Sequence, residues 1–295
     1  MSPSRSVEPP LSSGQSVPAP LSISFSGSGF LATYQLGVAQ SMRDRSPRVL
    51  QTAPKVMGAS AGSLVAAAVV CGSSLDMVRD EMLRFARQMR GRVLGPLHPA
   101  GNVSVWIERM LRLMLPADAH IRASGRLAIA MTRIPDGQNI MVSKFTSRED
   151  VVQHYVDGGF SSIQPTNSCP IGHTLTVSPF AGETDICPKD PAPLCDIVVS
   201  GAYLHCSLVN GYRILHAIYP YDWEALDKAY HSGYRDGLHF LHTSGHHLPQ
   251  TMDFDRSSSP RPWTLTGHRL PQTMDFDRSW TMDFDRSSPP PDHGL

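Results

Sequence analysis

Ser60 is the residue of this sequence whose surroundings best suit covalent chemistry. It is the centre of residues 58–62, which read GASAG and fit the pattern G-x-S-x-G, with Gly58 and Gly62 as the turn glycines. A strand-like run precedes this pentapeptide, and an apolar run of small residues, 62–70, follows it. A tight turn between a strand and a helix projects a serine hydroxyl above a sheet. The pattern therefore predicts a nucleophilic serine, with a purely structural glycine turn as the alternative.

A second glycine-rich turn consists of Gly27, Ser28 and Gly29 and follows residues 21–25, which alternate between apolar and polar. Backbone N–H groups of such a loop stabilise a carbonyl oxygen as it becomes negative, by about 3–4 kcal/mol for each donor. The spacing also fits a dinucleotide-binding loop, which requires an acid at the end of the next strand. Asp44 is the nearby acid, but its neighbours form a charged loop. We interpret 27–29 as an oxyanion loop, with a nucleotide loop or simple packing as alternatives.

A third candidate is Asp157, which is followed by Gly158 and Gly159 and preceded by the β-like pair 155–156. A carboxylate at a sharp turn can accept the serine proton directly, provided that partial desolvation raises its pKa from about 3.9. A Ser60–Asp157–His173 triad has the chain order of the α/β hydrolases and is the competing arrangement. The Asp-Gly-Gly sequence alone is also compatible with an ordinary turn.

The elements around these residues alternate between strand and helix. Residues 21–25 and 55–57 are predicted strands, and residues 30–42 and 62–70 are predicted helices. A strand, a glycine-rich turn and a helix thus occur twice within about 50 residues. This alternation predicts an α/β fold with a mostly parallel sheet.

The rest of the chain completes this layered fold. We expect helices at 75–90 and 103–115, a hairpin of strands 127–132 and 139–143, and a strand at 174–178. Residues 196–241 are predicted to be helical throughout, with a break at Pro220 and a new helix that begins at Trp223. Pro, Asp and Gly at 135–137 supply the hairpin turn. The methionines of the helices at 75–90 and 103–115 are interpreted as core residues. The weaker alternative is that these methionines and Trp106 contact lipid at a membrane surface.

Composition excludes several classes of protein. The 26 basic and 26 acidic side chains balance, so no basic surface for nucleic acid is expected. The longest apolar run, residues 64–71, is far shorter than the ~20 residues of a spanning helix. The N-terminus lacks the pattern of a signal peptide, and the odd number of cysteines, five, is most simply read as reduced thiols. We therefore expect a cytoplasmic protein, neither secreted nor transmembrane, without a metal site.

The two ends of the chain differ from its middle. Residues 1–20 are rich in Ser and Pro and are predicted to be a disordered leader. In the stretch 242–295 the sequence LPQTMDFDRS occurs twice, and a shorter copy follows. The repeat is too short and too polar for a solenoid, so we expect a disordered, repeat-bearing tail. The folded domain is expected to span residues 21–241.

Together and in this order, the three motifs resemble the patatin-like phospholipase family. The likeness extends to residues 24–31, 145–150, 177–180 and 185–188, and to the stretch 159–165. It points to the vertebrate subgroup that includes adipose triglyceride lipase, and most closely to its epidermal ω-O-acylceramide transacylase. The resemblance implies a three-layer α/β/α patatin-like fold and a Ser60–Asp157 dyad, with Gly27, Ser28 and Gly29 as the oxyanion loop.

The resemblance has two departures. Ala32 replaces the last glycine of the family's first motif, which is a mild change because alanine is small and donates the same N–H. More seriously, the family has a helix end, a loop and a strand before Asp-Gly-Gly. Here only three residues, His154 to Val156, separate Gln153 from Asp157. A segment is therefore missing near 153/154, and even a ~1 Å misplacement of a catalytic group can cost ~100-fold in rate.

The resemblance implies a lipid acyl hydrolase or transacylase without a cofactor. Its substrates would be triacylglycerol or phospholipid, with water or a ceramide as the acceptor, at the surface of a lipid droplet or membrane. A co-activator protein is a further implied partner. The alternative is a catalytically impaired regulatory protein that keeps the fold and binds lipid surfaces.

Overall fold

A computed structural model describes residues 20–90, 103–133, 138–157, 164–165, 174–190, 193, 195–199, 202–220 and 222–244 of the chain. The chain divides into two compact units, Met1–Leu248 and Pro249–Leu295, and every described residue belongs to the first. The expected leader lies outside the described residues except for Pro20, and the repeats of the expected tail lie outside them entirely.

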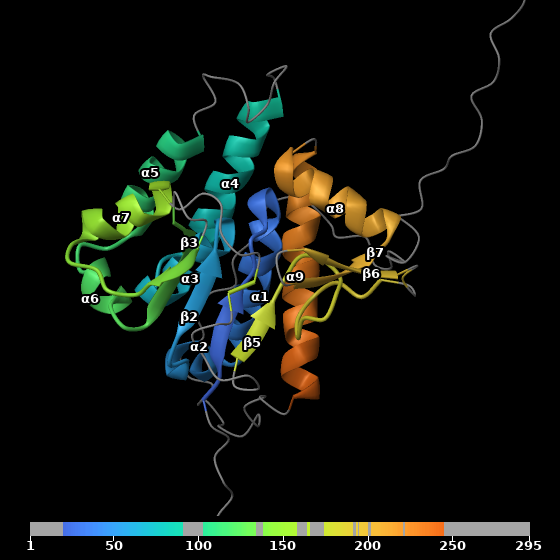
Figure 1. Ribbon diagram of the computed structural model, residues 1–295, viewed down its shortest axis with the longest axis horizontal. Coiled ribbons are helices and arrows are strands. Elements are labelled where there is room, and N and C mark those ends of the chain that lie inside the picture. Colours follow the sequence, from blue (N-terminus) through green and yellow to red (C-terminus); the bar gives the residue numbers. More distant parts are fainter. Residues whose placement is uncertain are drawn as a thin grey trace, which may run out of the picture. The chain divides into compact units, whose positions relative to one another are not determined.

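A five-stranded sheet forms the centre of the described unit, with the strand order β4-β3-β2-β1-β5 (Figure 1). Strands β1 (Ser22–Phe25), β2 (Val56–Ala59), β3 (Leu127–Thr132) and β5 (Thr174–Val177) are parallel to one another. Strand β4 (Asn139–Val142) is antiparallel to β3, as the predicted hairpin requires, although its turn lies outside the described residues. The mostly parallel sheet, flanked by helices, confirms the predicted α/β/α fold class.

The register of the sheet brings two loops together. Phe25 of β1 pairs with Gly58 of β2, so both strands end at the same edge. The chain leaves β1 through the glycine-rich loop and the short 3-10 helix η1 (Gly29–Leu31), and it leaves β2 through Ser60. In parallel sheets, ligands bind at the carboxyl ends of the strands.

The helices after these two loops are almost entirely buried. Helix α1 (Ala32–Arg45) is followed by the short α2 (Pro47–Thr52), and helix α3 (Ala61–Cys71) follows Ser60. All residues of α3 from Gly62 onward are buried, and α3 packs against β1, β2 and β3. The longest apolar run of the sequence is therefore a core helix.

Four helices come from the middle of the chain: α4 (Leu75–Arg90), α5 (Val103–Met114), α6 (Ala119–Ala123) and α7 (Arg148–Asp157). The inner faces of α4 and α5 carry buried methionines, among them Met82, Met89, Met110 and Met114. The half-buried ring of Trp106 stacks on Phe85 with 4.3 Å between ring centroids. These contacts support core packing as the role of the methionine-bearing faces.

The prediction of helices throughout 196–241 is wrong at its start. Strands β6 (Cys195–Val199) and β7 (Ala202–Cys206) form an antiparallel hairpin, and only then do α8 (Leu208–Ile218) and α9 (Trp223–Thr243) follow. β-Branched and aromatic residues favour strands here, and Ser207 marks the real helix start by accepting a hydrogen bond from Asn210 N at 3.0 Å. The predicted break at Pro220 and restart at Trp223 are confirmed.

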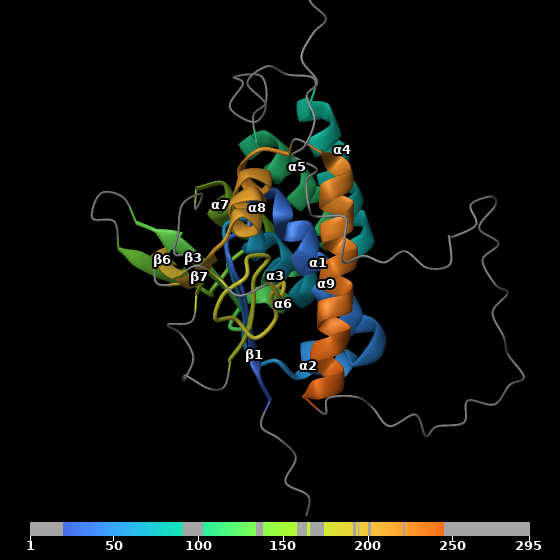
Figure 2. The same cartoon turned by 90° about the vertical axis from the view of Figure 1, so that its right-hand side faces the viewer.

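Helix α9 lies along α1 at unusually close range (Figure 2). Glycines on both helices allow the contact. A Cβ atom on Gly233 would lie 2.0 Å from the carbonyl oxygen of Tyr34, and one on Gly37 would lie 2.0 Å from the carbonyl oxygen of Tyr230. Beside this contact, Tyr34 Oη donates a hydrogen bond to Asp236 Oδ2 at 2.7 Å. Backbone contact thus sets the spacing of the two helices.

Gly233→Ala should therefore destabilise the fold. The added methyl group cannot be accommodated unless α1 and α9 separate, and overpacking of this kind costs about 1–3 kcal/mol in the free energy of unfolding. Thermal and urea unfolding measure the effect. Gly211→Ala in α8 is the matched control, because nothing lies within 4 Å of the added Cβ atom. Equal stability of the two variants would contradict the proposed close contact.

Candidate active site

Ser60 has the backbone conformation of a strained strand-to-helix turn. Its φ is 48° and its ψ is −128°, and it is the one non-glycine residue with positive φ among those the structure describes. Such sparsely populated conformations cost of order 1–3 kcal/mol and concentrate at functional sites. Ser60 lies between the last residue of β2 and the first residue of α3, and it is exposed although its neighbours are largely buried.

The two turn glycines are required by direct backbone contact. A Cβ atom on Gly62 would lie 2.2 Å from the carbonyl oxygen of Ser26, and one on Gly58 would lie 2.4 Å from Ser63 Cα. Ser63 closes the turn, because its backbone N–H donates to the carbonyl oxygen of Ser60 at 3.0 Å. The contact of Gly62 with Ser26 also places the serine turn directly against the loop that leaves β1.

The loop that leaves β1 presents backbone N–H groups at this edge of the sheet. Ser26 N donates to the carbonyl oxygen of Val177 at 3.0 Å, whereas within the described part of the chain the next three N–H groups, of Gly27, Ser28 and Gly29, carry no hydrogen bond. Gly29 has φ +51°, and a Cβ atom on it would lie 2.0 Å from the carbonyl oxygen of Ala217. The loop is therefore held in a conformation that requires glycine at position 29, and these three N–H groups have no partner among the described residues.

Gln35 of α1, which is not among the predicted site residues, is the central support of this loop. Its side chain is fully buried, and Nε2 donates to the carbonyl oxygen of Ser26 at 2.9 Å and to that of Val177 at 3.4 Å. Its Oε1 accepts a hydrogen bond from Ser28 Oγ at 3.0 Å. One amide thus connects the ends of β1 and β5 with the glycine loop. The available signal was a glutamine inside an otherwise buried helix, close after a glycine-rich turn.

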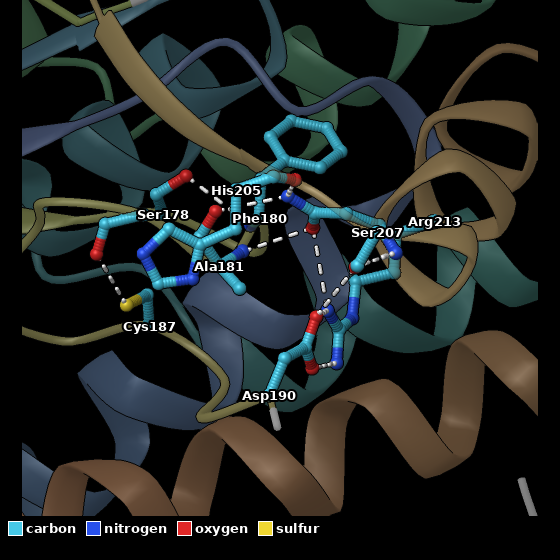
Figure 3. Close-up of polar contacts among 10 residues, drawn as sticks. Ser178, Phe180, Ala181, Cys187, Asp190, His205, Ser207 and Arg213 are labelled. Carbon is cyan, nitrogen blue, oxygen red and sulfur yellow. Dashed lines mark hydrogen bonds and ion pairs between the residues drawn. The ribbon is translucent and has the colours of Figure 1, made fainter. Parts of the chain in front are cut away.

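Helix α8 forms a wall of the same loop, because Ala217 lies against Gly29. Asn210, which is 1% exposed, accepts a hydrogen bond from Ala181 N at 3.0 Å and donates to the Ala181 carbonyl oxygen at 2.9 Å. Figure 3 shows Arg213 of α8 facing Asp190, with two contacts of 2.7 Å between guanidinium and carboxylate. Bidentate pairs of this kind fix orientation. These contacts anchor α8, and through it they position the glycine loop.

The predicted base, Asp157, is the last residue of α7, and the expected strand at 155–156 is wrong because both residues are helical. Glu149 and Asp150 in the first turn favour a helix start, Asp150 N donates to Ser147 Oγ at 3.0 Å, and no helix breaker occurs before Gly158. The side chain of Asp157, together with Gly158, Gly159 and His173, lies outside the described residues. The predicted dyad and triad therefore remain predictions.

The nucleotide-loop alternative lacks its acid. Asp44 belongs to α1 and not to a loop, and its carboxylate accepts hydrogen bonds from Gln40 Nε2 at 2.8 Å and from Tyr234 Oη at 3.0 Å. Ser60 is the residue that follows the second strand, where a ribose-binding acid would stand. In the described ranges, no three His, Cys, Asp or Glu side chains come together as a metal site, and no helix is long and apolar enough to cross a membrane.

Fold and geometry together define an α/β protein that presents a serine on a strained turn beside a glycine-rich loop. Residues 23–155 match the family model of the patatin-like phospholipases. The chain belongs to the patatin-like phospholipase family.

The relatives are whole proteins about twice as long as the matched region. The chain is 38% identical over 246 residues to rat patatin-like phospholipase domain-containing protein 2, and the alignment covers 76% of this chain and 51% of the rat protein. It is 35% identical to human omega-hydroxyceramide transacylase (75% and 46%) and 35% identical to mouse patatin-like phospholipase domain-containing protein 5 (76% and 56%). The chain thus spans about half the length of these relatives, and the identities do not single out the transacylase.

The same comparisons reveal positions that this chain lacks. The alignment with the rat protein has 246 positions, but it covers only 76% of the 295 residues of this chain, which is fewer residues than positions. Part of the relatives' matched region therefore has no counterpart here. The loss of a segment near 153/154 itself stays a prediction.

Proposed function

We propose that this protein is a serine-dependent lipid acyl hydrolase or transacylase in which Ser60 is the nucleophile. The observation that carries the proposal is the strained, exposed conformation of Ser60 between β2 and α3, in a turn whose Gly62 lies against Ser26 at the start of the glycine loop. A turn that holds a serine side chain out of a buried core at a cost in backbone energy supports a chemical role for that side chain.

The proposed reaction has two steps. Ser60 Oγ attacks the ester carbonyl carbon while its proton passes to the base, and the resulting oxyanion is stabilised by the backbone N–H groups of Gly27, Ser28 and Gly29. The N-terminus of the buried helix α3 adds a favourable dipole at the same place. Collapse of the intermediate expels the alcohol and leaves an acyl-serine. The acyl group is then transferred to water or to an acceptor alcohol, and Ser60 is regenerated. The reaction requires neither metal nor nucleotide.

Asp157 is the proposed base, since it heads the Asp-Gly-Gly sequence and ends α7, a helix that packs against α5 and α6. A carboxylate in this role accepts the Ser60 proton and returns it to the leaving alcohol. Gly158 and Gly159 would supply the sharp turn that follows it. His173 is the alternative base and would act with Asp157 in a triad.

The proposed substrates are esters of long acyl chains. Relatives are named patatin-like phospholipase domain-containing proteins and an omega-hydroxyceramide transacylase, which supports a phospholipid as acyl donor and a ceramide as acceptor. Triacylglycerol is the other proposed donor, and water the other proposed acceptor. We further propose that the protein is cytoplasmic and acts peripherally on lipid droplets or membranes, where a co-activator protein could assist it.

A second candidate function is that of a lipid-surface regulatory protein without catalysis. It is favoured by the positions that this chain lacks and by the helical course of residues 155–157, which differs from the strand expected before the base. Such a protein would keep the buried α3 and the anchored α8 while failing to assemble its base.

Turnover by the purified full chain distinguishes the two functions. Emulsified triacylglycerol and phosphatidylcholine vesicles are incubated with the protein, with and without an ω-hydroxyceramide acceptor, and the released fatty acid and acylated ceramide are quantified by mass spectrometry. Release or transfer of acyl chains well above the protein-free blank is the expected result. A folded protein that binds the vesicles but yields no product with any donor or acceptor would favour the regulatory candidate.

A further inference from the structure

Two cysteines face each other across the β6–β7 hairpin. The register pairs Cys195 directly with Cys206, at the end of the hairpin away from its turn. Directly opposed residues of an antiparallel pair have Cα atoms about 4.5–5.5 Å apart. Disulfides require about 4.4–6.8 Å between Cα atoms, so the backbone already has the spacing of a bridge.

The two thiols are in contact and accessible. Both are free cysteines, Cys195 is exposed and Cys206 is half-buried. The pKa of Cys195 is raised, chiefly because its thiol forms a hydrogen bond with Cys206 that favours the protonated form. Thiols within hydrogen-bond reach of each other are close enough to react with a common partner.

A metal site is the competing explanation for such a cluster, because His205 and Asp196 are adjacent in sequence to the two cysteines. The register pairs Asp196 with His205, and the distance from His205 Nε2 to Asp196 Oδ1 is 3.8 Å. Successive side chains of a strand point to opposite faces. The thiol pair and the His–Asp pair therefore lie on opposite faces of the hairpin and cannot surround one metal ion.

We propose that Cys195 and Cys206 are a redox-active pair whose reversible disulfide clamps the β6–β7 hairpin. The oxidant is a small-molecule disulfide such as glutathione disulfide. The thiolate of Cys195 attacks one sulfur of this disulfide, which breaks the S–S bond and releases one glutathione thiolate. The thiolate of Cys206 then attacks the Cys195 sulfur of the mixed disulfide and releases the second glutathione. Two electrons pass to the oxidant, and the two protons lost by the protein thiols are taken up by the glutathione thiolates.

The clamp acts on a vulnerable part of the fold. Strand β6 is exposed along most of its length, whereas β7 also forms backbone hydrogen bonds with Ala181 and Glu183. A two-stranded hairpin with one exposed strand gains little stability from packing. Strand β7 holds the buried Leu204, and Cys206 directly precedes Ser207, the cap of α8. Closing the short loop between the two cysteines removes conformations from the unfolded chain. Oxidation therefore stabilises the hairpin and the start of α8, independently of any role of Ser60.

The test compares the reduced and oxidised full chain. The protein is reduced, equilibrated anaerobically with mixtures of reduced and oxidised glutathione, quenched with acid, alkylated and digested. We expect a peptide pair linked through Cys195 and Cys206, a mass lower by about 2 Da, and a Tm higher by roughly 5–10 °C. Added dithiothreitol should reverse both changes.

Single variants make the assignment specific. Cys195→Ser and Cys206→Ser should each abolish the oxidant-dependent rise in Tm. Cys187→Ser is the matched control and should retain it, since this half-buried thiol instead contacts the carbonyl oxygens of Gly182 and Thr184, both at 3.5 Å. The proposal is overturned if both thiols remain free or carry only separate glutathione adducts in the folded protein. A bridge from Cys195 to another cysteine, or a Cys195–Cys206 bridge without a change in Tm, would equally overturn it.

Discussion

Ser60→Ala should reduce the release of fatty acid from triacylglycerol and phosphatidylcholine to the level of a protein-free blank. Removal of the hydroxyl leaves no atom to form the acyl-serine, and loss of a serine nucleophile costs on the order of 10⁵–10⁶-fold in kcat. The substitution should not destabilise the fold, because the exposed side chain contributes little to the core and alanine occupies the same turn. Fatty-acid release, together with labelling by a fluorophosphonate probe, measures the effect.

Ser104→Ala is the matched control for this prediction. Ser104 is an exposed serine on α5, far in sequence from the strained turn, and its replacement should leave both turnover and labelling unchanged. Equal activity of Ser60→Ala and the wild-type protein would show that the nucleophile is another group. Loss of activity accompanied by a large fall in Tm would point instead to a structural role for this turn.

Asp157→Asn should lower kcat by about 100- to 10,000-fold, which is the range that a general base contributes. The amide has the size of the carboxylate but cannot accept the Ser60 proton. Because acylation then depends on solvent as the base, fluorophosphonate labelling should slow in parallel with ester hydrolysis. Initial rates at several pH values and the rate of labelling measure the two effects.

Two further variants show which base is present. Glu149→Gln alters an exposed carboxylate on the same helix, which forms an ion pair with Arg112 at 2.9 Å, and should leave turnover unchanged. His173→Ala should have no effect under the dyad and should abolish activity under the triad. An active enzyme that is indifferent to both Asp157→Asn and His173→Ala would refute both proposed arrangements of the base.

Support of the glycine loop comes from three directions, which makes it more rigid than its sequence suggests. Gln35 fixes it from α1, the carbonyl oxygen of Val177 accepts from Ser26 N at the end of β5, and Ala217 closes it from α8. Oxyanion donors are effective because they need no reorganisation when charge develops. The anchoring of α8 by Asn210 and by the Arg213–Asp190 pair therefore belongs to the same functional unit as the loop.

The sequence by itself determined the central elements and the three motifs. The strands before Gly27 and Gly58, the helices after them and the β3–β4 pairing follow from alternation, apolar runs and turn residues, which are local signals. The family was also accessible from these motifs and was confirmed by comparison. Local patterns were insufficient where short segments fit two structures. Strands β6 and β7 were predicted to be helical, and the end of α7 was predicted to be a strand.

Only the tertiary structure decided how the candidate site is held together. The strained φ of Ser60 depends on the contact of Gly62 with Ser26, and the open glycine loop depends on Gln35 and on a helix about 190 residues further along the chain. The pairing of Cys195 with Cys206 likewise depends on a hairpin register that the spacing of the two cysteines does not encode. These features arise from contacts between segments distant in sequence, whereas residue types and periodicity report on neighbours along the chain. The sequence therefore identifies the chemical groups, and their placement follows from the packing of the folded chain.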